Sequence, residues 1–333
     1  MSACIIGAGI AGLLLILSLD TINRVDNLYI IDPHFDGGDL ARKWTNVLSN
    51  TPWSVTLNSI KQYLPNLVIP QWAYKLPLDQ PTPVYIIAKL IRELAAPILR
   101  RVNCVQGFVE SAAWNSTTSE WTIRIKNVLT VISVKRMYLT YGAQEKSLDI
   151  SIPSIPLEIA LDSARLSKYI QPTDKVVVFG TRHSGTIILK NLVDCSANSV
   201  IAIHNGTAPF IWARDGEYEG LKLESAIIAD NIIKGLYKNV ECISTSNISA
   251  LIRETRSANW VIYAIGFRPH GEIIFTVDSV SPSSMKYDTT GKLLECPSTW
   301  GFGFAYPNQA PDGIHWDVGV SSFLEHISKQ PLS

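Results

Sequence analysis

The chain has 333 residues, of which 47% are hydrophobic and 17% charged, with 29 basic and 29 acidic side chains and a pI of about 7.0. This composition is typical of a globular protein with a sizeable core, and the length leaves room for two domains. The neutral balance excludes an extended basic surface, so neither nucleic acid nor an anionic membrane is expected as a partner.

The chain begins with a glycine-rich turn between two regular elements. Ala3 to Ile6 predicts a short buried strand, and the pattern G-x-G-x-x-G follows it at Gly7, Gly9 and Gly12. In dinucleotide-binding folds the first glycine permits a tight turn, the second lets the backbone approach a pyrophosphate, and the third allows close helix–strand packing. The sequence therefore predicts a dinucleotide site, against the plainer alternative of a glycine-rich turn without a ligand.

The elements after the turn fit this interpretation. Residues 13–19 predict a buried helix whose N-terminus would face phosphates, and residues 27–31 predict a second strand. Asp32 ends that strand, where an acid about 20 residues after the glycines accepts hydrogen bonds from ribose hydroxyls. The apolar run over 5–19 is not expected to be a signal peptide or membrane anchor. No positive residue precedes it, and it is shorter than the ~20 residues needed to span a bilayer.

The segment from 33 to 97 contains little periodic sequence before one helix. A polar loop over 33–53, with two glycines and Trp44, is expected to pass over the part of the ligand beyond the adenosine. Residues 55–83 are rich in proline and predict a long irregular segment with short helical turns. Residues 84–95 are amphipathic at helical spacing, and we expect this helix to end before Pro97.

Alternating apolar and polar residues then predict strands. Together they indicate a small antiparallel meander over about 104–135, followed by a buried strand that ends on Gly142. The predicted strands are 102–105, 107–114, 120–126, 130–134 and 138–143.

The middle of the chain repeats the order of its beginning. A connector over 150–156 leads to a strand, a glycine turn, a helix and a second strand, which predicts a second Rossmann-like unit. Its elements are expected at 175–179, 180–185, 186–193 and 199–203, followed by a helix at 220–235 and strands at 240–243 and 259–269. After an aromatic run at 300–306, residues 317–326 predict a final helix with Asp317 as its N-cap.

These motifs together resemble flavoproteins with two dinucleotide-binding domains. They are most similar to flavin-dependent monooxygenases and their uncharacterised FAD/NAD(P)-binding relatives. The matching stretches are GAGIAG at 7–12 with Asp32, the pair Gly37 and Gly38 with Trp44, YLTYGA at 138–143, FGTRHSG at 179–185 and VIYAIGFRP at 261–269. In the last stretch Ile265 replaces the threonine of the family's ATGF strand end.

The resemblance implies an α/β fold of two Rossmann-like three-layer domains, the first with an inserted antiparallel β-meander. It assigns 1–156 to an FAD-binding domain, 157–268 to an NAD(P)-binding-like domain and 269–333 to a return to the FAD domain. The resemblance also implies that Asp32 accepts hydrogen bonds from the adenosine ribose and that Val109 lies beside the adenine. The helix at Asp317 would point its N-terminus toward the flavin. The implied FAD-binding residues are Gly7, Ala8, Gly9, Ile10, Ala11, Gly12, Asp32, Pro33, His34, Gly38, Leu40, Trp44, Asn50, Val109, Gly142 and Asp317.

The second glycine turn departs from the pattern. Arg182 stands at the middle glycine position, and the strand after it ends in His-Asn-Gly at 204–206, with neither an acid for an NAD ribose nor an arginine pair for a 2′-phosphate. Arg182 and a protonated His183 could instead pair with phosphate. The site is therefore predicted to bind NADPH or NADH, or to be vestigial. Its candidate residues are Gly180, Arg182, His183, Ser184 and Gly185.

Other chemistries find little support in the sequence. The five cysteines form no CxxC pair, so disulfide-reductase activity and a zinc site are not expected, and reduced thiols indicate a cytoplasmic protein. No catalytic triad or carboxylate pair is apparent. The function expected is an FAD-dependent oxidoreductase, reduced by NAD(P)H and reacting with oxygen on a small molecule. The alternatives are a non-enzymatic or vestigial flavin-binding protein and an oxidase that its own substrate reduces.

Overall fold

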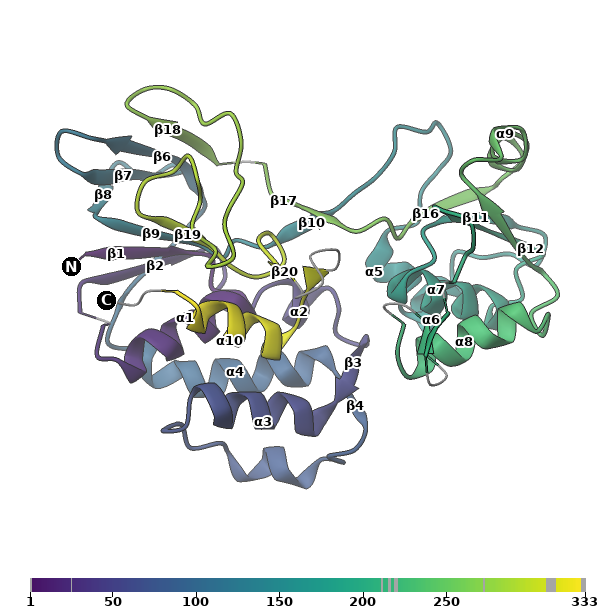
Figure 1. Cartoon of the computed structure of the whole chain (residues 1–333), viewed down its shortest axis with the longest axis horizontal. Helices are drawn as coiled ribbons and strands as arrows, with labels where there is room; N and C mark the ends of the chain where they lie inside the picture. The colour runs from purple at the N-terminus through teal and green to yellow at the C-terminus, as the bar shows by residue number, and fades with distance from the viewer. Residues whose placement is uncertain are drawn as a thin grey trace. The chain divides into compact units, whose positions relative to one another are not determined.

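The computed structural model describes residues 2–24, 26–210, 212–214, 217–218, 221–271, 273–309 and 316–330. The chain divides into two compact units, and the first is made of two separate segments (Figure 1). The first unit comprises Met1–Gln144 and Arg268–Ser333, and the second comprises Glu145–Phe267. Each is built on a parallel sheet, so the fold is mixed α/β.

The first unit contains a five-stranded parallel sheet with the strand order β19-β9-β1-β2-β5. The strand that precedes the glycine turn lies at its centre, between β2 and β9. The five strands are β1 (Ala3–Ile6), β2 (Leu28–Asp32), β5 (Asn103–Gln106), β9 (Arg136–Leu139) and β19 (Thr299–Gly301).

Helices cover one face of this sheet (Figure 1). They are α1 (Ile10–Thr21), α3 (Trp53–Tyr63), α4 (Val84–Leu99) and α10 (Val320–Ser328). Helix α1 is apolar on all sides because it packs against the sheet and against both α4 and α10. Within the described residues, no helix combines the length and apolar character needed to cross a membrane.

A second sheet, of order β18-β6-β7-β8, packs on the opposite face. Its strands are β6 (Val109–Asn115), β7 (Glu120–Ile125), β8 (Val131–Val134) and β18 (Ile274–Val277). β6, β7 and β8 are antiparallel neighbours, whereas β18 pairs parallel to β6. β5 belongs to the parallel sheet through its pairing with β2, so the antiparallel strands begin at Val109 and not near residue 104.

The second unit contains a parallel sheet of order β15-β12-β11-β16. Its strands and helices are β11 (Lys175–Phe179), β12 (Ser199–His204), β15 (Val240–Ser244), β16 (Trp260–Tyr263), α5 (Leu157–Ala160), α6 (Ser163–Leu166), α7 (His183–Asp194), α8 (Glu224–Ile233) and α9 (Ile248–Arg256). The short remaining elements of the chain are α2 (Asp39–Arg42), η1 (Gln71–Lys75), β3 (Leu48–Pro52), β4 (Pro81–Pro83), β10 (Ala143–Glu145), β13 (Trp212–Arg214), β14 (Glu217–Tyr218), β17 (Phe267–Pro269), β20 (Asn308–Gln309) and β21 (Trp316–Asp317).

The chain enters the second unit after Gln144, earlier than the residue 156 expected from the sequence. The proline-containing connector is hydrogen-bonded to β16: Val261 N donates to Pro153 O at 3.0 Å, and Ile155 N donates to Val261 O at 2.9 Å. These bonds attach it to the second sheet, so it is part of that unit.

Two helices differ from the sequence expectation between residues 53 and 99. The proline-rich segment expected to be irregular begins with α3, whose inward face carries Trp53, Leu57 and Ile60, all buried. Helix α4 continues past Pro97 to Leu99. Because Pro97 lies in the last turn, its missing N–H removes only one hydrogen bond near the end of the helix.

The final helix begins at Val320, three residues later than predicted, and Asp317 is not its N-cap. Gly319 occupies that position with φ +126°, a backbone conformation that side chains disfavour. Asp317 lies in β21 opposite Asn308, and its carbonyl oxygen accepts from Ser322 Oγ at 2.9 Å. Two helices of the second unit also differ from the prediction. The helix predicted at 186–193 begins earlier, at His183, and the helix predicted at 220–235 is shorter, spanning Glu224–Ile233.

Candidate functional site

Two glycines of the first turn are required by packing. Gly7 has φ +104°, and a Cβ there would lie 2.5 Å from the carbonyl oxygen of Thr140. A Cβ on Gly12 would lie 2.0 Å from the carbonyl oxygen of Gly7. Thr140 secures the turn from β9, since its Oγ1 donates to Gly7 O at 2.7 Å. This role of Thr140 was not predicted, because it depends on a contact across the sheet.

The middle glycine is not required by packing in the same way. A Cβ on Gly9 would have its nearest neighbour, Gly38 Cα, at 4.0 Å, and the backbone of Gly9 is not in the left-handed region. Gly9 forms an isolated parallel bridge with Gly37, and a Cβ on Gly38, which has φ +75°, would lie 3.0 Å from Gly9 Cα. The start of the loop predicted over 33–53 therefore lies against the turn at Gly37 and Gly38, and the protein itself leaves room for a methyl group at residue 9.

The N-terminus of α1 has no side-chain cap. Its first-turn residues Ile10 and Ala11 are buried, and Gly303 of the C-terminal segment packs against them: a Cβ on Gly303 would lie 2.7 Å from Ala11 Cβ. A helix N-terminus without a cap presents backbone N–H groups and a partial positive charge, the arrangement that binds phosphate in dinucleotide sites.

Asp32 holds the turn and the following loop together. Its Oδ2 accepts from Ala8 N at 2.7 Å, and its Oδ1 accepts from the backbone N–H groups of His34 and Phe35 at 2.7 and 2.8 Å. Each carboxylate oxygen can accept more than one hydrogen bond, so these contacts leave capacity for a ribose hydroxyl.

Residues beside Asp32 extend this edge of the sheet. Gln106 Nε2 donates to the carbonyl oxygen of Pro33 at 3.0 Å, and the rings of His34 and Phe108 meet edge to face with centroids 6.4 Å apart. Phe108 is 54% exposed, which is high for a large aromatic side chain. Neither Gln106 nor Phe108 was predicted, because their proximity to Asp32 depends on the pairing of β5 with β2.

The remaining predicted residues of this site lie in different surroundings. Leu40 packs against the core from α2, and Trp44, which follows α2, is half-buried. Asn50 is exposed in β3, and Val109 is buried in the core between the two sheets. Gly142 has φ +80° just after β9, where His270 is the one described residue that comes within 4.0 Å of its Cβ position.

The second turn repeats the backbone geometry of the first. A Cβ on Gly180 would lie 2.3 Å from the carbonyl oxygen of Ala264, and one on Gly185 would lie 2.1 Å from the carbonyl oxygen of Gly180. Arg182 is the N-cap residue of α7, with ordinary φ −77°, and its side chain is exposed. The substitution of arginine for the middle glycine therefore leaves the fold of the turn intact.

His183 begins α7 and is held by Ser225. Ser225 Oγ donates to Lys222 O at 2.7 Å and accepts from Lys222 N at 3.1 Å, so His183 Nδ1, at 3.1 Å, acts as a donor to it. Burial lowers the pKa of His183, although Glu224 opposes this effect. The imidazole is thus neutral near pH 7.

A cavity of about 740 Å³ lies at this turn, at the carboxyl ends of the four parallel strands. Its lining includes the whole turn from Gly180 to Ser184, with Asn205 and Thr245 from the ends of β12 and β15. Ala264 and Gly266 follow β16 on the other side. This edge of a parallel sheet is where ligands of doubly wound folds bind.

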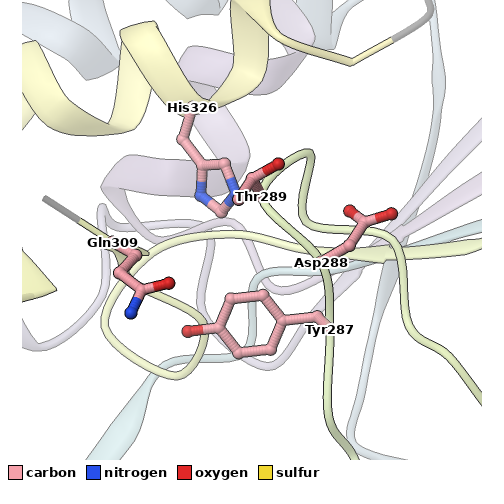
Figure 2. Close-up of a pocket in the computed structure, with 5 residues that line it drawn as sticks. All are labelled: Tyr287, Asp288, Thr289, Gln309 and His326. Atoms are coloured by element: carbon pink, nitrogen blue, oxygen red, sulfur yellow. The ribbon is translucent and has the colours of Figure 1, made fainter. Parts of the chain in front are cut away.

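A second, smaller pocket of about 310 Å³ lies in the first unit, and none of its lining residues was predicted from the sequence. Figure 2 shows His326 projecting from α10 toward the loop of Asp288 and Thr289, with Tyr287 and Gln309 on the same pocket. His326 is 1% exposed, its Nδ1 has no hydrogen-bond partner among the described residues, and burial lowers its pKa to about 4.

Thiol and metal chemistry have no centre in the described parts of the chain. All five cysteines are free, Cys4 and Cys296 are buried, and burial raises the pKa of Cys296 to about 11. Among the described residues, no three His, Cys, Asp or Glu side chains are grouped to hold a metal ion.

Comparison with known proteins gives one relative by sequence and several by structure. No family model matches the chain. "Monooxygenase AgnR1" of Paecilomyces divaricatus is 24% identical, and the alignment covers 98% of this chain and 96% of the relative.

Among solved structures, the bacillithiol disulfide reductase Bdr (YpdA) of Bacillus cereus has a TM-score of 0.64 at 12% identity, covering 98% of this chain and 95% of its own. The FAD-bound form of OTEMO has a TM-score of 0.58 at 13% identity, covering 99% and 81%. The Lactococcus lactis thioredoxin reductase also has 0.58 at 13%, covering 98% and 95%. The resemblance to two-domain flavoproteins inferred from the motifs is therefore confirmed, and the similarity to reductases and monooxygenases alike lies in the fold.

Proposed function

We propose that the protein is an FAD-dependent oxidoreductase that takes electrons from NADPH or NADH and reacts with oxygen as a monooxygenase on a small molecule. The observation that carries the proposal is the first glycine turn. Packing requires Gly7 and Gly12, but only the approach of a ligand accounts for glycine at residue 9, where the protein leaves room for a side chain. The full-length relative is named a monooxygenase, which supports the same class.

The residues at the turn fit the cofactor. The N–H groups of Ile10, Ala11 and Gly12 would donate to its pyrophosphate, and Asp32 would accept from the adenosine ribose. Phe108 is exposed at the same edge and offers a face for the adenine, with Val109 behind it in the core. When bound, FAD would supply a ring that passes electrons from a hydride donor to oxygen.

The loop and tail segments would shape the flavin end. Gly38, Leu40, Trp44 and Asn50 follow the ribose-binding edge, and Gly142 lies between β9 and β10. Asp317 lies just before α10, whose Gly319 N-cap lacks a side chain that could satisfy the first N–H groups. These groups would face the ring and stabilise negative charge on it.

A disulfide reductase is not favoured, although such enzymes share the fold, because the five free cysteines form no CxxC pair. A vestigial second site is not favoured either, because Gly180 and Gly185 keep the turn and a cavity of about 740 Å³ accompanies it. The free thiols fit a reducing compartment such as the cytoplasm.

The test is an anaerobic flavin spectrum of the purified chain, with Gly9→Ala as the diagnostic variant. The wild type should carry FAD that NADPH or NADH bleaches. Gly9→Ala should weaken FAD binding at least tenfold. The free energy of unfolding of the apoprotein should fall by only ~1 kcal/mol, because alanine is a poorer N-cap residue than glycine but its methyl group meets no close protein atom.

Gly271→Ala is the matched control, since no described residue comes within 4 Å of its Cβ position and its φ is ordinary. This variant should bind FAD normally. A colourless protein that FAD does not stabilise would refute the proposal. Wild-type FAD affinity in Gly9→Ala would remove the observation on which it rests.

A further inference from the structure

The cavity of the second unit carries an unusual distribution of charge for a nicotinamide dinucleotide site. Among its described lining residues, only Arg182 and His183 are ionisable, and both lie on the phosphate-binding turn. Dinucleotide sites distinguish NAD from NADP through an acid at the end of the second strand, which binds the ribose diol, or an arginine, which binds the 2′-phosphate. The described lining contains neither at that strand end.

The register of the two sheets identifies the residue at the position of the ribose acid. In the first unit Gly7 N donates to Ile31 O at 2.8 Å, and in the second Gly180 N donates to Ile203 O at 2.8 Å. His204 therefore occupies the position of Asp32. It is 6% exposed and does not line the cavity, so it cannot replace the carboxylate.

The next residue, Asn205, is the one that reaches the cavity. Its side chain is exposed, and Thr245 Oγ1 donates to its Oδ1 at 2.8 Å. This bond fixes the orientation of the amide, whose NH₂ group is a donor for other acceptors. An NH₂ donor serves a 2′-hydroxyl oxygen and a 2′-phosphate oxygen alike, whereas a carboxylate would repel the phosphate and an arginine would favour it.

Arg182 adds a positive charge that does not depend on the 2′ position. It stands at the position of the middle glycine of the first turn. Its guanidinium, in place of the close backbone approach that glycine permits, would therefore contact the pyrophosphate that NADH and NADPH share. His183 is neutral near pH 7, because burial lowers its pKa, and its Nδ1 donates to Ser225. The charge of the lining therefore favours binding of a dinucleotide but does not discriminate between NADH and NADPH.

We propose that the second unit binds NAD and NADP with affinities within tenfold of one another, and that Asn205, held by Thr245, is the residue that contacts the adenosine ribose. The inference rests on the proposed function in that the ligand is the electron donor's dinucleotide. It goes beyond that function by naming the residue that contacts the adenosine ribose and by predicting that the site discriminates little between NADH and NADPH.

The test is calorimetric titration of the full chain with NAD⁺ and with NADP⁺. In the wild type the two dissociation constants should differ by less than tenfold. Asn205→Asp should weaken NADP⁺ binding at least tenfold without weakening NAD⁺, because the carboxylate repels the 2′-phosphate and accepts from the diol. Asn205→Arg should strengthen NADP⁺ binding at least tenfold and leave NAD⁺ unchanged.

The matched control is Asn259→Asp, which adds the same charge at the opposite edge of the sheet. Asn259 lies just before β16, and an aspartate can still accept the hydrogen bond that Lys175 N donates to it at 2.8 Å. Its ratio of dissociation constants should match that of the wild type.

Three results would overturn the inference. A more than tenfold difference between the two wild-type dissociation constants would show that another group contacts the 2′ position. Loss of that difference in Arg182→Gln would identify the group as Arg182. An unchanged ratio in both Asn205 variants would exclude Asn205. Binding of neither nucleotide by a chain that holds FAD would exclude the site and the NAD(P)H donor, while leaving the flavin part of the proposed function intact.

Discussion

The three glycines of the first turn differ in what restricts their side chains. Gly7 and Gly12 are fixed by contacts within the protein, since a Cβ on either would overlap a carbonyl oxygen. Gly9 has space for a Cβ. The second turn supports this distinction, because it keeps Gly180 and Gly185 but has Arg182 at the middle position. The middle residue is thus the one whose side chain the packing of the turn does not restrict.

Another single residue, His326, should make the free energy of unfolding depend on pH. Its pKa is lowered from 6.5 to about 4, chiefly by burial and further by Lys329, while Asp288 and Glu325 oppose the shift. Below pH 6.5 the unfolded chain binds a proton that the folded chain rejects, so the free energy of unfolding falls as the pH drops from 6.5 toward 4. Between pH 7.5 and 5 the loss from this residue should be about 2 kcal/mol.

Urea unfolding of His326→Phe at the two pH values checks this expectation. The phenyl ring keeps the ring contacts with Phe302 and Tyr287 but does not titrate, so the variant should lose about 2 kcal/mol less than the wild type. His270→Gln, at a partly exposed position, should behave as the wild type does. Equal pH dependence in His326→Phe and wild type would contradict the assignment.

Single residues were predictable from the sequence where their role is local. The turn from Gly7 to Gly12 and Asp32 belong to one short strand–helix–strand unit, so spacing alone indicated them. Thr140, Gly303 and Phe108 reach the same turn or its edge from distant parts of the chain. No periodic pattern records such contacts, because they depend on which strands pair.

At the scale of elements, the second turn should tolerate no side chain where α7 crosses β11. Gly185→Ala would place its Cβ 2.1 Å from the carbonyl oxygen of Gly180, so the helix must move away from the strand. We expect the second unit to lose about 1–3 kcal/mol, as in other overpacked cores. Hydrogen exchange of the β11 and β12 amides measures this loss.

The neighbouring Ser184→Ala, also in α7, is the control and should leave exchange in β11 and β12 within about 0.5 kcal/mol of wild type. Slow, wild-type exchange in Gly185→Ala would mean that the turn does not have the geometry described. The first unit should exchange normally in both variants, because its own turn is unchanged.

Elements with a strong period or a glycine turn were predicted well, and those set by tertiary contacts were not. Helix α3 carries Trp53, Leu57 and Ile60 at helical spacing, but it follows Pro52 without a side-chain cap and lies in a proline-rich stretch. Helix α10 begins at Val320 because Gly319 takes a conformation that its sequence alone does not specify. In both, the N-terminus was misplaced or missed because no capping side chain marks it.

At the scale of the whole molecule, each unit carries its own parallel sheet and its own glycine turn. The order of strands beside the turn is the same in both: the strand before the turn lies between the next strand and a later strand that ends near a glycine. This repeat was visible in the sequence as two strand–turn–helix–strand segments. The return of the C-terminal segment to the first unit was expected only from the resemblance, since β19 pairs with β9 across nearly half the chain.

Because each turn belongs to a separate unit, the two ligands should protect different parts of the chain from hydrogen exchange. FAD should slow exchange at residues 7–12 and at the loop beginning with Asp32, while NADP⁺ should slow it at 180–185 and 205–206. At a ligand concentration 100 times the dissociation constant, the protection should approach ~2.7 kcal/mol for amides that exchange only through unfolding of that unit. The comparison of apoprotein, FAD-loaded protein and protein with NADP⁺ measures this directly. Protection of the 180–185 turn by FAD, with no effect at 7–12, would reverse the assignment of the two sites, and the room that the protein leaves at Gly9 would then need another explanation.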